Sequence, residues 1–133
     1  MAAAAPDPRQ LMAQMDLIQR ELQRAERRLA ALEQAMVEAQ QALGTVRHLA
    51  ESGGVQQALL PIGGGLHVRA IVDATQDVLL PIGAGYSTPG KPVEVAKALE
   101  ERVASLGRAY EEAAGRADEL ANAAAALNEQ LPP

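Results

Sequence analysis

LLPIGGG, residues 59–65, returns with one change as LLPIGAG, residues 79–85, twenty positions further along the chain. Each copy is an apolar run that contains one proline and ends in glycines. Glycine tolerates the positive φ of tight turns, and proline removes a backbone donor, so each copy suits a strand end that leads into a turn. The repeat therefore favours a duplicated β-hairpin, and its alternative is a pair of glycine-rich phosphate loops.

The segment between and around the two copies alternates with the period of a strand. Leu66, Val68, Ala70 and Val72 alternate with more polar residues, which predicts a half-buried strand, followed by a turn at 73–77, a run at 78–82 and a short strand near Tyr86. Isolated hairpins with apolar residues on both faces cannot bury themselves or satisfy their edges. We therefore expect this region to assemble with strands of other chains, through Leu59, Leu60, Ile62, Leu66, Val68, Val72, Val78, Leu79, Leu80, Ile82 and Tyr86.

Two long heptad patterns flank the hairpins. Apolar residues recur in steps of four and three from Leu11 to Ala50, and again from Ala96 to Leu131. If the two helices pack antiparallel, the numbers of facing residues must sum to a constant. A constant of 142 gives every residue of the second seam a partner in the first without a slip. The sequence therefore predicts an antiparallel coiled coil.

The helix limits carry their own signals. Asp7 is a suitable N-cap with Pro8 at the first helical position, and Ser52-Gly53-Gly54 should stop the first helix. The expected fold class is α+β, a long coiled-coil hairpin with two β-hairpins at the end that connects the helices. The expected divisions are a disordered tail at 1–6, a helix at 7–52, the hairpins at 53–92, a helix at 93–131 and a tail at 132–133.

Composition excludes several classes of protein. The chain has no Trp or Phe and two Tyr, so an elongated or oligomeric molecule is expected rather than a globule with an aromatic core. A net charge of −5 argues against a nucleic-acid partner. The absence of cysteine excludes disulfides. No signal peptide or membrane-spanning run is evident, so we expect a soluble, cytoplasmic protein.

The candidate chemical motifs are incomplete. Residues 63–65 lead into a strand pattern rather than into Gly-Lys-Ser/Thr and a helix, and Thr88 replaces the third glycine of a dinucleotide fingerprint. His48 and His67 have no carboxylate pattern around them, and Asp73 and Asp77 are better explained as turn residues. We predict no catalytic residue, no cofactor site and no metal site, and hence no enzyme.

The end of the coiled coil away from the hairpins has apolar residues beyond its seam. Met12 and Leu17 lie outside the seam, at its e and c positions, and terminal layers are those most able to fray. An apolar tip that contains Met suits adaptable binding of hydrophobic segments. The alternative is that these residues only finish the coiled coil or are disordered. The residues of this candidate tip for binding other proteins are Leu11, Met12, Met15, Leu17, Ile18, Leu127 and Leu131.

The order of heptad helix, LLPIGGG and LLPIGAGYS hairpins, and returning heptad helix resembles the α class of the prefoldin family, in its archaeal form. The resemblance covers nearly the whole chain and is most specific over residues 59–86. It implies a hetero-hexamer of two α and four β subunits whose hairpins join in a multi-subunit β-barrel. It also implies capture of unfolded polypeptides at the coiled-coil tips without ATP, and their delivery to a group II chaperonin.

Two functional hypotheses follow. The first is an ATP-independent holdase subunit of this kind, with prefoldin β subunits, unfolded clients and a chaperonin as partners. The second is a structural coiled-coil adaptor that scaffolds another complex through its hairpins and has no affinity for unfolded chains.

Overall fold

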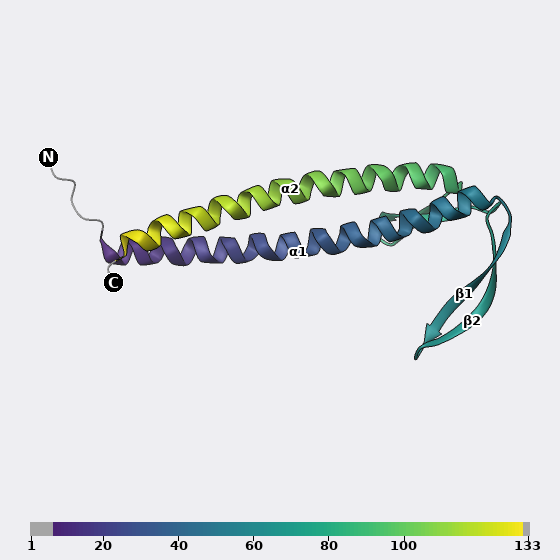
Figure 1. The fold of residues 1–133 in the computed structure, drawn as a ribbon, viewed down its shortest axis with the longest axis horizontal. Helices are drawn as coiled ribbons and strands as arrows, with labels where there is room; N and C mark the ends of the chain where they lie inside the picture. Colours follow the sequence, from purple (N-terminus) through teal and green to yellow (C-terminus); the bar gives the residue numbers. More distant parts are fainter. Residues whose placement is uncertain (1–6, 132–133) are drawn as a thin grey trace. The chain divides into compact units, whose positions relative to one another are not determined.

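The computed structural model describes residues 7–131, so the tails expected at 1–6 and 132–133 lie outside the described residues. Two long helices enclose four strands in the sequence (Figure 1). The order is α1 (Pro8–Ser52), β1 (Val55–Gly63), β2 (Leu66–Asp73), β3 (Val78–Gly83), β4 (Tyr86–Gly90) and α2 (Pro92–Gln130). The two helices and two antiparallel hairpins confirm the predicted fold class.

Both limits of α1 follow the expected capping chemistry. The carboxylate of Asp7 accepts a hydrogen bond from the backbone N–H of Arg9 at 3.0 Å, and Pro8 is the first helical residue. At the other end Gly53 adopts a φ of 59° and donates its N–H to the carbonyl of Leu49 at 3.3 Å. This left-handed glycine ends the helix because it satisfies a carbonyl of the last turn at little steric cost.

The four strands form two separate two-stranded antiparallel sheets, β1 with β2 and β3 with β4. In each hairpin the register shifts between the proline and the following glycine of the repeat, at Pro61/Gly63 and at Pro81/Gly83. Gly64 and Gly65 have positive φ in the first turn, as do Ala84 and Gly85 in the second. Positive φ at both central residues is what a type I′ hairpin turn requires, so the repeat is a duplicated hairpin.

The chain divides into two compact units, which we describe separately. The first comprises the described parts of Met1–Met36 and Ser105–Pro133. Here the seam residues of both helices are buried or half-buried, with Leu11, Ala113, Ala117 and Leu120 the most buried. Arg116 forms an ion pair with Glu21 at 3.4 Å. Their numbers sum to 137, five below the predicted constant, as expected for side chains that flank an antiparallel seam.

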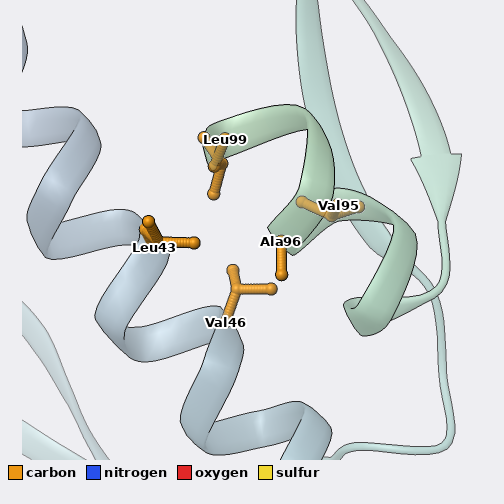
Figure 2. Packing of buried hydrophobic residues seen from close by; sticks show 5 residues of the cluster. All are labelled: Leu43, Val46, Val95, Ala96 and Leu99. Atoms are coloured by element: carbon orange, nitrogen blue, oxygen red, sulfur yellow. The ribbon is translucent and has the colours of Figure 1, made fainter. Parts of the chain in front are cut away.

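The second unit, Val37–Ala104, has a core of five buried residues (Figure 2). Leu43 and Val46 point from α1 toward side chains of α2, with Ala39 buried one turn earlier. Arg47 and Glu100 flank this core in an ion pair at 2.8 Å, and their numbers sum to 147, five above the constant. The antiparallel register predicted from the heptads therefore agrees with the side-chain pairing in each unit. The core residues are Leu43, Val46, Val95, Ala96 and Leu99.

The second hairpin also contributes to this core. Val78 and Leu80, alternate residues of β3, pack against the cluster. At the end of β4, a Cβ built on Gly90 would lie 2.9 Å from Cγ2 of Val95, so only glycine allows the strand to pass this close to α2. An ion pair between Lys91 and Asp77 at 3.1 Å closes the base of the same hairpin.

Candidate functional site

The first hairpin presents one apolar face and one mixed face. Paired residues share a face, and the register pairs Leu60 with Val68 and Ala58 with Ala70. The opposite face carries Leu59 paired with Arg69, together with other polar and apolar residues. Leu60 is 55% exposed and Val68 is 47% exposed, so the apolar face is uncovered along the outer half of the hairpin. We call the face formed by Ala58, Leu60, Val68, Ala70 and Val72 the hairpin face, and Gln56, which pairs with Val72, lies on it at the base of the hairpin.

In the second hairpin, the face that corresponds to the hairpin face packs against the core of the second unit. Leu80 corresponds to Leu60 in the repeat, yet Leu80 is half-buried against the core of the second unit. Leu79, on the other face of β3, is exposed, as are Ile82 and Tyr86 near the turn. Of the residues predicted for assembly, Val78 and Leu80 therefore have neighbours within their own chain, and Val72 is half-buried. The others are exposed: Leu59, Leu60, Ile62, Leu66, Val68, Leu79, Ile82 and Tyr86.

Sequence reasoning missed two exposed apolar residues of the first hairpin. Ile71 is 74% exposed and Val55 is also exposed, both on the mixed face. Alternation assigned Ile71 to the polar side of its strand. Its β-branched side chain among polar residues was the available signal that this face is not purely polar.

The candidate tip lies in the first unit, and its seven residues differ in exposure. Met12 is 64% exposed and Leu17 is 60% exposed, whereas Leu11 is only 5% exposed. Met15, Ile18, Leu127 and Leu131 are half-buried in the seam. Five residues of helix turn through about 140° beyond one full rotation, so Met12 and Leu17 lie on different flanks of α1. The structure therefore offers two accessible apolar side chains at the tip above a closed seam.

The acidic and histidine side chains considered as candidate chemical groups lie in a turn or on the exposed surface. Asp73 accepts hydrogen bonds from the hydroxyl of Thr75 at 2.6 Å and from its backbone N–H at 2.9 Å. These bonds, the hydroxyl first, hold the pKa of Asp73 below its ordinary value, as expected for a turn-forming carboxylate. His48 and His67 are both exposed. Over residues 7–131 no group of three or more His, Cys, Asp or Glu side chains is placed to hold a metal ion.

The glycines of the repeat do not form phosphate loops. Each turn joins two antiparallel strands, and a strand rather than a helix begins directly after residues 63–65 and after residues 83–85. The arrangement of loop and helix N-terminus that binds phosphate is therefore missing from both copies. Neither helix has, among its described residues, a stretch both long and apolar enough to cross a membrane.

An open groove of about 710 Å³ lies between the helices of the first unit, at the layer of Ala25. Small residues, including Ala113 and Gly115, form part of its lining, and arginines and glutamates of both helices surround them. The mixture of both charges with small side chains selects no particular ligand.

Comparison with known proteins agrees with this architecture. The family model for prefoldin subunits matches residues 18–132. Prefoldin subunit alpha of Methanococcoides burtonii is 23% identical over 121 residues, which cover 91% of this chain and 88% of that protein. Prefoldin subunit alpha of Methanoculleus marisnigri is 32% identical over 103 residues, which cover 77% of this chain and 68% of that protein.

The fold has a solved counterpart. The cryo-EM structure of filamentous PFD from Methanocaldococcus jannaschii superposes with a TM-score of 0.55 at 22% identity, covering 92% of this chain and 95% of that one. The superposition supports the fold, and the family model, which spans most of the sequence, supports membership. With two heptad helices, two hairpins and matched relatives that are alpha subunits, the chain belongs to the prefoldin family of chaperone subunits.

Proposed function

We propose that this chain is a subunit of an ATP-independent holdase that assembles through its hairpins and binds unfolded polypeptides at its tip. The observation that carries the proposal is the distribution of exposed apolar side chains. In the second unit they concentrate on the hairpins, and in the described part of the first unit the large ones are Met12 and Leu17. Exposed apolar side chains that gather in one part of a protein mark an interaction site, and the hairpins and the tip are two such groups, which suit two separate partners.

The hairpins are the proposed assembly surface. Two-stranded sheets with open edges and exposed apolar faces are marginal in water unless other strands cover them. The partners we propose are the other subunits of a cytoplasmic hexamer, a second copy of this chain and four prefoldin β subunits. Ile62 and Ile82 are exposed near the two turns, so Ile62→Asp and Ile82→Asp should each abolish this assembly.

The tip is the proposed client surface. Unfolded polypeptides expose apolar side chains without a fixed shape, and a Met side chain adapts to irregular partners. The alternative role, in which the tip residues only finish the coiled coil, suits the buried Leu11 but not the exposed Met12 and Leu17. Delivery of the client to a group II chaperonin completes the proposed function, and transfer of a labelled client between the two complexes would measure it.

An aggregation assay tests the proposal. The chain is assembled with a prefoldin β subunit and mixed, without ATP, with a denatured model protein whose aggregation is followed by light scattering. We expect the complex to suppress aggregation. The variant with Met12, Leu17 and Ile18 all changed to Ser should lose most of this suppression and keep its assembled mass.

The control is Val37→Ser, because Val37 is an exposed apolar residue of the same helix outside the tip. It should suppress aggregation as well as the unmodified chain does. An assembled complex that fails to suppress aggregation would instead favour the structural adaptor, the second candidate function. Loss of the complex in the tip variant would show that the tip is structural.

A further inference from the structure

The tip of the first unit carries a chemically reactive side chain. The sequence has four methionines, and three of them, Met12, Met15 and Met36, lie in the described part of the first unit. Met12 is 64% exposed, whereas Met15 and Met36 are half-buried. The chain has no cysteine, so its sulfur atoms are all thioethers. Among the described residues, the sulfur of Met12 is therefore the one that a solute in water reaches most easily.

We propose that Met12 is a site of reversible oxidation by peroxide, and that its conversion to methionine sulfoxide weakens the binding of unfolded polypeptides at the tip. The inference deepens the proposed function and rests on it for the client. The selectivity of the oxidation can be measured independently of that function. The inference adds a modification site and a means of regulating the tip.

The reaction transfers one oxygen atom to sulfur. A lone pair of the Met12 sulfur attacks one oxygen of hydrogen peroxide, so that an S–O bond forms and the O–O bond breaks. The departing hydroxide and the proton of the transferred oxygen combine as water, so sulfur is oxidised and the peroxide is reduced by two electrons. Methionine sulfoxide reductase reverses the change with a dithiol, which becomes a disulfide while the oxygen leaves as water.

Access to the sulfur determines which methionine reacts first. Peroxide must touch the sulfur atom, so a half-buried thioether reacts more slowly than an exposed one. Met12 lies outside the heptad seam of α1, whereas Met15 and Met36 are seam residues and half-buried. We expect Met12 to be oxidised several-fold faster than either seam methionine.

Oxidation removes the property by which the tip is proposed to bind clients. Met12 and Leu17 are the two large exposed apolar side chains in the described part of the first unit. A sulfoxide is polar and accepts hydrogen bonds from water, so burying it against an apolar segment is unfavourable. Loss of the Met12 contact should weaken client binding at one tip by about five- to thirtyfold.

The fold and the assembly should tolerate the modified side chain. Because Met12 is not a seam residue, its sulfoxide oxygen can face water while the seam stays closed. All four strands belong to the second unit, so oxidation of Met12 should leave the assembled mass unchanged. Oxidation of Met15 would differ, since it would place a polar oxygen in the half-buried seam.

Peptide mapping measures the selectivity. Trypsin cuts after Arg9 and Arg20, so Met12 and Met15 fall on one peptide, residues 10–20, and fragment masses distinguish the two sulfoxides. The complex assembled with a β subunit is treated with dilute hydrogen peroxide and sampled over time. Sulfoxide should accumulate first at Met12. Equal rates at the two positions, or a faster rate at Met15, would overturn the inference.

Protection by a client tests whether Met12 lies in the binding surface. An excess of a reduced and alkylated model protein, which stays unfolded, is added before the peroxide. Bound client should cover Met12 and slow its oxidation several-fold, while the rate at Met36 stays the same. A complex that suppresses aggregation without any such protection of Met12 would overturn the inference.

The aggregation assay with matched variants measures the consequence, and each complex is compared with its own untreated sample. Peroxide should reduce suppression by the unmodified complex, and methionine sulfoxide reductase should restore it. The Met12→Leu complex should resist peroxide, because any other methionine of the complex is still present and is not the one that matters. Met15→Leu, a replacement of similar volume on the same peptide, should stay sensitive. Sensitivity of Met12→Leu, or resistance of Met15→Leu, would refute the assignment.

The outcomes distinguish this inference from the proposed function. A complex that still suppresses aggregation when Met12 is fully oxidised would overturn the inference and support the holdase. An untreated complex that does not suppress aggregation would overturn the holdase and, with it, the effect of oxidation on client binding.

Discussion

Leu60 and Leu80 hold the same place in the two copies of the repeat, but we expect Leu80→Ala to lower mainly the stability of the single chain and Leu60→Ala to weaken mainly subunit association. Leu80 packs against the core of the second unit, so Leu80→Ala should lower the free energy of unfolding of the single chain. A fully buried Leu→Ala change costs about 2–5 kcal/mol, and Leu80 is half-buried, so about 1–2 kcal/mol is expected. Leu60 is 55% exposed, and Leu60→Ala should change this free energy by less than about 0.5 kcal/mol.

For the free energy of subunit association, we expect Leu60→Ala to have the larger effect of the two variants. Full burial of a Leu side chain is worth about 1.5–3 kcal/mol, and roughly half of that is still available to Leu60 when a partner covers the hairpin face. Leu60→Ala should therefore weaken subunit association by about 1 kcal/mol for each copy, or roughly fivefold. Leu80→Ala should weaken it less, because Leu80 already has its neighbours.

Two measurements check this pair of variants. Urea unfolding, at protein concentrations where the chain is monomeric, gives the stability difference. Titration with a β subunit, followed by mass, gives the association difference. If Leu60→Ala destabilises the single chain as much as Leu80→Ala does, the two hairpins are equivalent and the reasoning fails.

Further predictions concern single sites. Gly90→Ala should cost about 1–2 kcal/mol net in urea unfolding, because the added Cβ would lie 2.9 Å from Val95, and overpacking outweighs the loss of unfolded-state entropy. Gly54→Ala, whose Cβ would meet an oxygen at an ordinary 3.7 Å, should be neutral or stabilising, and an equal loss in both would remove the packing explanation. Gly44→Ala should raise helix stability by about 1 kcal/mol, since nothing lies within 4 Å of its new Cβ, and a lower melting temperature would contradict this. The pKa of Asp73 is lower in the folded chain than its ordinary 3.8, so its contribution to stability is fully present above that pH and is lost as the pH falls through the folded pKa. Thr75→Val should reduce this loss in acid unfolding, and identical acid profiles would count against it.

Local sequence predicted the elements and their register because each depends on near neighbours or on one simple periodicity. Asp7 caps α1 as expected, and the turn glycines have the positive φ that their positions require. The constant of 142 agrees with the ion pairs in both units because a heptad without stutters keeps the same register along the whole seam.

The different surroundings of the two hairpins could not be predicted in this way. Leu60 and Leu80 sit in the same local sequence, and only the packing of β3 against α1 and α2 distinguishes them. The close approach of Gly90 to Val95 is likewise a tertiary contact, and no sequence pattern within β4 predicts it. The exposure of an apolar residue at Ile71 was missed because alternation assigns apolar residues to a face that packs on a core. The first hairpin has no core of its own, so the alternation does not separate a buried face from an exposed one.

The small accessible surface of the tip gives a physical reason for a holdase to be an oligomer. Met12 and Leu17 are each about three-fifths exposed, so covering both would contribute roughly 2–4 kcal/mol. Association of two molecules costs at least about 4 kcal/mol in lost translational and rotational freedom, so one tip of this chain alone should bind a client very weakly. Joining several tips in one complex makes each later contact intramolecular, and such linkage raises avidity by about 10² to 10⁴. Assembly through the hairpins would then be the condition for client binding, and a variant that cannot assemble should lose holdase activity even though its own tip is intact.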